Sequence, residues 1–134
     1  MPSQMRIQRI AGRVREEMSE LLVYQIQDPR LLGVTVTDVQ IDRELAFADI
    51  YVSAVEGSER AKDVVDALQH AGSFIRHYLA EKVQLRSFPK LRFYWDPTPE
   101  RADRIEQLFA QLHQEEKPAA EIDVETEGDI QDEE

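Results

Sequence analysis

A long helical pattern broken by three small residues is the feature that most limits how this chain can fold. Within residues 61–85, apolar residues recur at helical spacing on both sides of the break. The break is Ala71, Gly72 and Ser73, in which glycine is a poor helix former and serine a good N-cap. We therefore expect a helix that bends or stops near Gly72 and restarts at Ser73.

An N-terminal helix and a hairpin are expected before this helix pair. Residues 5–27 carry an apolar stripe at helical spacing, and Asp28-Pro29 should end the helix because the residue before proline avoids helical backbone angles. Two segments of alternating apolar residues flank a short turn at 42–44, which predicts an antiparallel hairpin. The alternation slips near Thr37-Asp38, which predicts a β-bulge there.

A third strand and a last helix should follow the helix pair. After Pro89, alternation turns Phe93 and Trp95 toward the core and Tyr94 toward solvent. Thr98 is expected to cap a final helix. The order α-β-β-α-kink-α-β, with a three-stranded sheet and a C-terminal helix, is an α+β arrangement that several small domains share.

Charge is sorted along the chain. The formal net charge is −11, but residues 115–134 hold ten acids and one lysine, whereas residues 1–114 hold 17 acids and 15 bases. Residues 1–114 are therefore expected to form one nearly neutral domain, and 115–134 a disordered acidic tail without a core-forming pattern. Inside the domain, residues 1–15 contain four arginines and no acid, and residues 76–92 contain five bases and one acid.

Several classes of site are not expected. The absence of cysteine excludes disulfides and thiolate metal sites and fits a cytoplasmic protein. No apolar run is long enough for a signal peptide or a membrane span. The three histidines lack a third convergent metal ligand, and no catalytic acid pair, nucleophile-base pair or glycine-rich phosphate loop appears. We expect no enzyme activity, no metal and no cofactor.

A basic surface on a helix-kink-helix favours binding to nucleic acid, because lysine and arginine neutralise phosphates. Small side chains at the kink would let a phosphate approach closely, although the kink would equally seat two helices on a sheet. The alternative interpretation is that these lysines and arginines are only solvated surface residues that form ion pairs with nearby glutamates. The predicted RNA-binding residues are Arg6, Arg9, Arg13, Ala71, Gly72, Ser73, Arg76, Lys82, Arg86 and Lys90.

An ordered set of short segments, spread from Met5 to His113, resembles ribosome-binding factor A, a bacterial ribosome-assembly protein with a type II KH-like fold. The segments are Arg6-Ile7-Gln8-Arg9-Ile10-Ala11, Asp28-Pro29-Arg30, Val34-Thr35-Val36-Thr37-Asp38-Val39, Asp42-Arg43-Glu44-Leu45-Ala46-Phe47-Ala48-Asp49-Ile50-Tyr51-Val52, Phe74-Ile75-Arg76 and Leu85-Arg86-Ser87-Phe88-Pro89-Lys90-Leu91-Arg92-Phe93. The family usually carries Ala-any-Gly at the kink, whereas here Gly72 is second and Ser73 third. A KH domain usually grips single strands with Gly-any-any-Gly, which this chain lacks.

The resemblance implies a function. Similar proteins bind the small (30S) ribosomal subunit and its 16S rRNA during late maturation, support processing of the rRNA 5′ end and growth in the cold, and leave with help from an assembly GTPase. It implies a cytoplasmic monomer that binds no membrane. Two alternatives stay open, namely a KH-like regulator that binds single-stranded RNA generally, and a protein-interaction domain that uses the hairpin edge for strand addition.

Overall fold

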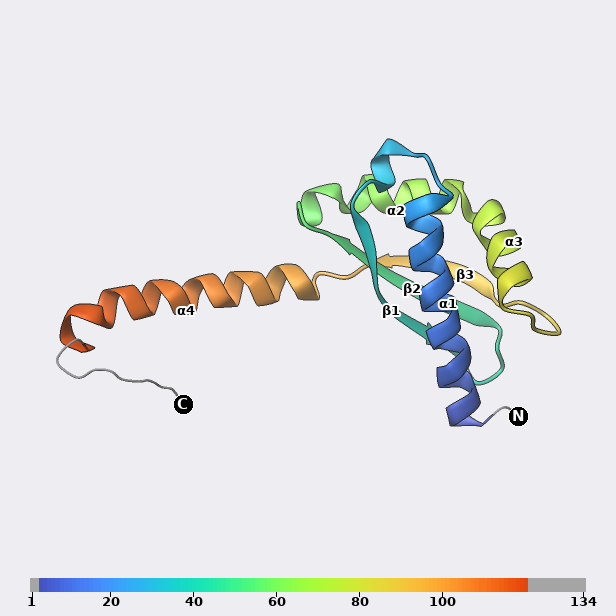
Figure 1. Ribbon diagram of the computed structural model, residues 1–134, viewed down its shortest axis with the longest axis horizontal. Helices are drawn as coiled ribbons and strands as arrows, with labels where there is room; N and C mark the ends of the chain where they lie inside the picture. The colour runs from blue at the N-terminus through green and yellow to red at the C-terminus, as the bar shows by residue number, and fades with distance from the viewer. Residues whose placement is uncertain (1–2, 121–134) are drawn as a thin grey trace. The chain divides into compact units, whose positions relative to one another are not determined.

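The computed structural model of the chain describes residues 3–120 and, of their side chains, those of residues 3–113. Two compact units are present, Met1–Pro97 and Thr98–Glu134. The elements of the first unit are drawn in Figure 1 and are α1 (Gln4–Tyr24), β1 (Val34–Ile41), β2 (Phe47–Ala54), α2 (Ala61–His70), α3 (Gly72–Lys82) and β3 (Lys90–Trp95), with 3-10 turns at Pro29–Leu31 and Ser58–Arg60. This order confirms the predicted α+β, type II KH-like fold.

The sheet has the strand order β1-β2-β3 and is mixed. β1 and β2 form the predicted antiparallel hairpin, whereas β2 and β3 run parallel. A parallel pair needs a long crossover, and α2 with α3 supplies it. The register between β1 and β2 shifts between Val36 and Asp38, which confirms the predicted bulge.

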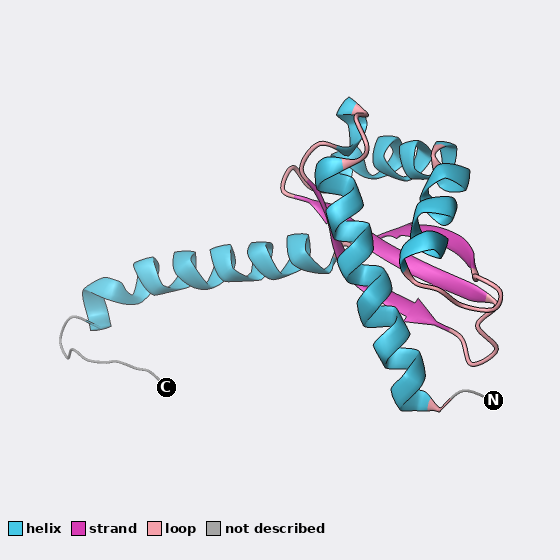
Figure 2. Ribbon diagram, turned by 45° about the vertical axis from the view of Figure 1, so that its right-hand side comes forward, coloured by secondary structure: helices cyan, strands magenta, loops and turns pink. Residues whose placement is uncertain are grey.

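The core lies between the sheet and three helices that cover one of its faces (Figure 2). The central strand β2 contributes Ala48, Ile50 and Val52, which are fully buried. Alternation along a strand sends successive side chains to opposite faces, so Asp49 and Tyr51 lie on the face away from the helices. Phe93 is buried and Tyr94 exposed, as predicted, and Trp95 is partly buried against the core.

The first helix ends earlier than the sequence suggested. α1 stops at Tyr24, three residues before the predicted end at 27, and the Gln25 N–H caps it by donating to the Leu21 carbonyl. Asp28 instead caps the following 3-10 turn, because its carboxylate accepts a hydrogen bond from the Arg30 N–H. The Asp28-Pro29 signal therefore marks the start of the next element.

The kink is present but differs in detail from the prediction. Ala71 alone separates α2 from α3, so the second helix starts at Gly72 rather than at Ser73, and no side chain caps it. The backbone at Gly72 lacks the positive φ found at Gly33 (77°) and Gly57 (92°), so the bend does not require glycine. α3 ends at Lys82 rather than near residue 85, because Val83 adopts extended backbone angles.

The turn between β1 and β2 is held by Asp42. Its Oδ1 accepts hydrogen bonds from the Ala46 and Phe47 N–H groups, both at 2.8 Å. These bonds hold a turn in which Leu45 has a φ of 57°, in the left-handed region that side chains rarely adopt. The Phe47 N–H, followed by the Ala46 N–H, holds the pKa of Asp42 below its ordinary value of 3.8.

Asp42 should therefore make the stability of this unit depend on acid pH. A lowered folded-state pKa stabilises the fold above the unfolded value of 3.8, and this contribution is lost as the pH falls through the lower folded pKa. Urea unfolding of the wild type and Asp42→Ala should show a difference at pH 7 that shrinks below pH 3.8. Asp42→Asn keeps the acceptor without the charge, and a constant difference between it and the wild type across this range would contradict the prediction.

The second unit contains the predicted final helix, α4 (Thr98–Ala120). Its backbone reaches six residues into the range 115–134, for which the sequence predicts an acidic tail, and residues 121–134 lie outside the described part. The domain boundary at residue 114 stays a prediction. Within residues 3–120, none of the helices has the length and apolarity needed to cross a membrane.

Candidate nucleic-acid interface

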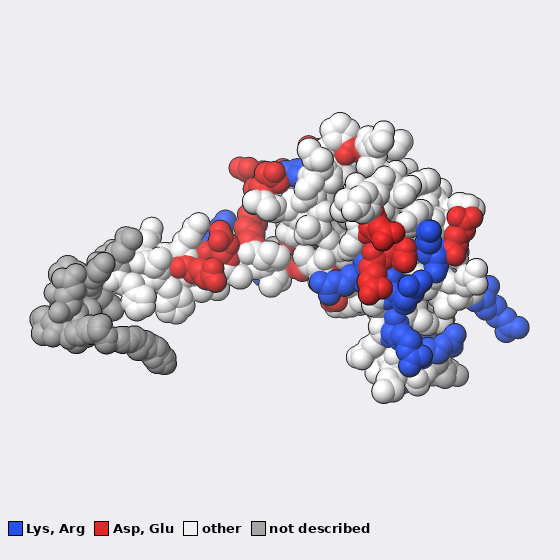
Figure 3. Space-filling view, viewed as in Figure 1, with Lys and Arg blue, Asp and Glu red and all other residues white. Residues whose placement is uncertain are grey.

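Four of the predicted cations line one hollow, which we call the basic groove. Arg6, Arg9 and Arg13 lie one turn apart on α1, and Lys82 comes from the last turn of α3. The groove has a volume of about 270 Å³, and no acidic residue lines it. Figure 3 shows lysine and arginine side chains gathered over the N-terminal half of α1 and beside the end of α3.

The cations of the basic groove are not equivalent. Arg13 is engaged, because its Nη2 donates to the Lys82 carbonyl at 3.0 Å and its Nη1 lies 3.7 Å from Glu17. A cation at the last carbonyls of a helix also opposes the helix dipole. Arg6 and Arg9 are exposed and form no ion pair within residues 3–113. These two arginines are therefore the most available to an anionic ligand.

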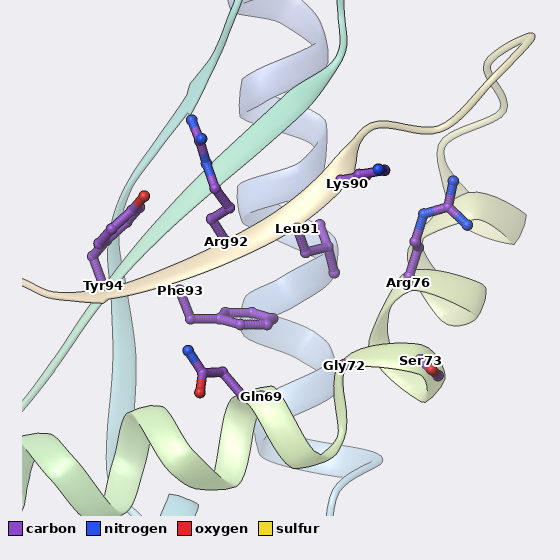
Figure 4. A pocket seen from close by; sticks show the side chains of 9 residues that line it. All are labelled: Gln69, Gly72, Ser73, Arg76, Lys90, Leu91, Arg92, Phe93 and Tyr94. Atoms are coloured by element: carbon purple, nitrogen blue, oxygen red, sulfur yellow. The ribbon is translucent and has the colours of Figure 1, made fainter.

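A second hollow, the kink groove, lies between the α2–α3 break and the edge strand β3, as Figure 4 shows. Its volume is about 440 Å³. Leu91 and Phe93 point from β3 toward the helices, and Arg92 and Tyr94 project from the opposite side of the strand. The lining residues are Gln69, Gly72, Ser73, Arg76, Lys90, Leu91, Arg92, Phe93 and Tyr94.

The kink itself is sterically open. A Cβ atom added at Gly72 would meet nothing within 4 Å, so a ligand can approach the backbone there. Ser73 is exposed, whereas Ala71 is half-buried and packs against the core. Leu68 and Ile75, one on each helix, are fully buried below the kink. The kink therefore seats two helices on the core and also leaves an open surface, which is compatible with both the packing role and the close approach of a phosphate.

Arg76 holds the loop that leads into β3. Its Nη2 donates to the Phe88 carbonyl at 2.8 Å, and its Nε donates to the Pro89 carbonyl at 3.3 Å. Phe88 and Pro89 are buried, and these partly buried hydrogen bonds give their carbonyls a protein partner. The guanidinium that the sequence predicted as an RNA contact thus also has a structural role.

Replacing Arg76 should loosen this loop. Arg76→Met removes both bonds and is expected to lower the free energy of unfolding by about 1 kcal/mol, because the side chain is partly solvated. Urea unfolding would measure that loss, and hydrogen exchange should show faster exchange in residues 84–88. Arg76→Lys keeps the charge without the paired geometry, so it should not restore protection. Unchanged exchange in Arg76→Met would refute the structural role.

Sequence reasoning did not find a cluster on the face of the sheet opposite α1, α2 and α3. Arg92 donates to both carboxylate oxygens of Asp49, at 2.6 and 3.1 Å, and lies 4.0 Å from the Phe47 ring centroid. The hydrogen bond that Arg92 donates to Asp49 raises the pKa of Arg92 above its already high ordinary value. These partners are 43 residues apart in sequence, and only the parallel register of β2 and β3 brings them together.

Arg86 and Lys90 lie outside the basic groove. Arg86 is exposed in the loop after α3 and lines neither groove, and Lys90 is exposed at the start of β3. His77 lies 3.5 Å from Glu81 on the α3 surface. Among the described side chains, no three histidines or carboxylates gather in a way that would hold a metal ion. The RNA-binding assignments stay predictions.

The sequence matches the family model of ribosome-binding factor A over residues 6–109. The chain belongs to this family. Relatives named ribosome-binding factor A include one from Alcanivorax borkumensis, 35% identical over 90% of this chain and 89% of the relative. Another, from Desulfitobacterium hafniense, is 38% identical over 84% of this chain and 90% of the relative.

Solved structures of ribosome-binding factor A agree with this membership. The solution structure of the Thermotoga maritima protein, described as a putative ribosome-binding factor A, is 30% identical, with a TM-score of 0.61 over 70% of this chain and 90% of that one. A Thermus thermophilus homology model, fitted into a cryo-EM map of a 30S complex with ribosome-binding factor A, is 27% identical, with a TM-score of 0.53 over 63% and 89%. The crystal structure of the Thermus thermophilus protein is 25% identical, with a TM-score of 0.60. The match covers 66% of this chain and 93% of the Thermus thermophilus chain.

Proposed function

We propose that this protein is a ribosome-assembly factor that binds the small (30S) ribosomal subunit through its 16S rRNA. The observation that carries the proposal is the basic groove, in which Arg6 and Arg9 are exposed and unpaired within the described residues and no acid faces them. Such a groove attracts a phosphate backbone by charge and counterion release. Family membership, and the 30S complex of the Thermus thermophilus relative, support the choice of ribosomal RNA over other polyanions.

In this proposal the domain acts by occupancy during late maturation in the cytoplasm. It holds immature rRNA helices apart, supports processing of the 5′ end and growth in the cold, and leaves with help from an assembly GTPase. A monomer suffices, because each groove is built within one chain. No residue is assigned a catalytic role, and the predicted contacts at Ser73, Lys90 and Arg86 extend the surface beyond the basic groove.

Co-sedimentation with immature small subunits, mature small subunits and full ribosomes, across a salt series, tests the proposal. Binding to small subunits but not to full ribosomes, weakened by salt, is the expected result. Absence of binding to every particle at low salt would overturn it. Salt-insensitive binding of a protein partner would then favour the alternative, strand addition at the hairpin edge.

A further inference from the structure

Two tyrosines form an aromatic stack on the face of the sheet opposite α1, α2 and α3. Tyr51 of β2 and Tyr94 of β3 are register partners, and their ring centroids lie 5.3 Å apart with an interplanar angle of 26°. Their neighbours Ile50, Val52 and Phe93 are buried in the core, so the two rings lie on the opposite face. This arrangement leaves a ring pair outside the core.

The outer ring of this stack is accessible. β3 is an edge strand, so within the described residues no further strand covers Tyr94 on the side away from Tyr51. Tyr94 is 39% exposed and lines the kink groove. A planar group held in the groove can therefore lie on Tyr94 and extend the stack to three rings.

The charges around the groove indicate what kind of ligand carries that planar group. Arg76 and Lys90 lie at one end of the groove and Tyr94 at the other, as Figure 4 shows, and no acidic residue lines it. Lys90 and Tyr94 are four residues apart on an extended strand, or about 13 Å. A ligand that touches both must be extended and must combine negative charge with a flat ring. Single-stranded nucleic acid has this chemistry, and basic protein segments do not.

We infer that Tyr94, backed by Tyr51, is a stacking site for one unpaired base of single-stranded RNA whose backbone runs along the kink groove. The inference rests on the proposed function and extends it to a site with a defined ligand class. Gln69 of α2 lines the side of the kink groove that faces β3, and its side-chain amide can donate and accept hydrogen bonds. Arg92 is already bound to Asp49, so the free charge for phosphate comes from Lys90.

Binding of a fluorescein-labelled uridine octamer, measured by anisotropy, tests the site. Tyr94→Leu should weaken binding roughly 5-fold to 100-fold, the range expected for one base–aromatic stack. Tyr94→Phe keeps the ring and should bind within about twofold of the wild type. Tyr24→Leu is the matched control, because Tyr24 is 73% exposed on α1 and lines neither groove.

Cross-linking of the unaltered protein gives a second readout that does not depend on how a variant folds. An octamer with 5-iodouridine should cross-link to Tyr94 under ultraviolet light, as peptide mass spectrometry would show. Equal binding by the wild type and Tyr94→Leu, or cross-links confined to other segments, would overturn the inference. The inference would also be overturned if the protein bound a polyarginine peptide through Tyr94 but did not bind the RNA octamer.

The failure of this inference differs from failure of the proposed function. If the protein sediments with small subunits, but Tyr94→Leu changes binding neither to the small subunit nor to the octamer, the proposed function stands and the stacking site is refuted. A protein that binds no ribosomal particle, but binds the octamer through Tyr94, retains the stacking site and favours a general single-stranded RNA regulator.

Discussion

Replacing Arg6 and Arg9 together with alanine should weaken binding to the small subunit about a hundredfold. Both side chains are exposed in the basic groove and form no ion pair within the described residues, so both are free to meet phosphates. A charge-assisted contact contributes about 1.5 kcal/mol or more, which is at least about tenfold in affinity for each arginine. Co-sedimentation at a fixed salt concentration would measure the loss.

The salt series adds a stricter criterion to the same experiment. Each phosphate contact that is removed should lower the slope of log affinity against log salt by about one, so the double variant should lose about two. Arg43→Ala with Arg101→Ala removes the same charge from exposed positions outside both grooves. If this control loses as much affinity and slope as the Arg6 and Arg9 variant, the effect reflects net charge and the basic groove is not the contact surface.

Truncating Leu68 to alanine should lower the free energy of unfolding by about 2–5 kcal/mol, the cost of removing a large aliphatic side chain from a packed core. Leu68 is fully buried at the last turn of α2, directly before the kink. The cavity would lie under both helices that frame the kink groove. The free energy of unfolding of a small domain is only about 5–15 kcal/mol in total, so the variant should unfold at a much lower urea concentration than the wild type.

Leu32→Ala is the matched control for this measurement. Leu32 is 77% exposed, so the same chemical change should cost less than about 0.5 kcal/mol. A similar loss in both variants would mean that the kink region is not a tightly packed part of the core. At low temperature the Leu68→Ala protein can be studied while it is folded. If it still binds the octamer, the substitution lowers stability without removing the side chains of the kink groove that bind the ligand.

The order of elements could be predicted from sequence because it rests on local patterns. Helical spacing, strand alternation and the slip at Thr37 each follow from residues within a few positions of one another. Element ends were less well predicted. The signal at Asp28-Pro29 is a cap for the turn that follows, and α3 stops at Lys82 although apolar residues continue.

The site could be predicted only in part, for a related reason. Clusters of arginine and lysine are visible in sequence, but their partners are not. Arg13 reaches the carbonyl of Lys82 across 69 residues, and Arg92 reaches Asp49 across 43. Such contacts depend on strand order and helix packing, which local patterns do not encode. The structure thus separates free cations from those that also hold the fold.

The parallel pairing of β3 with β2 has a consequence for how the domain assembles. The hairpin of β1 and β2 closes over a short turn, whereas β3 pairs with residues about 43 positions earlier in the chain, as Asp49 opposite Arg92 illustrates. Contacts of long sequence separation carry a larger chain-entropy cost and form slowly. The kink groove can therefore be complete only after β3, the last strand of the first unit, has been synthesised, and a chain shortened before Lys90 would have the kink without the strand that faces it.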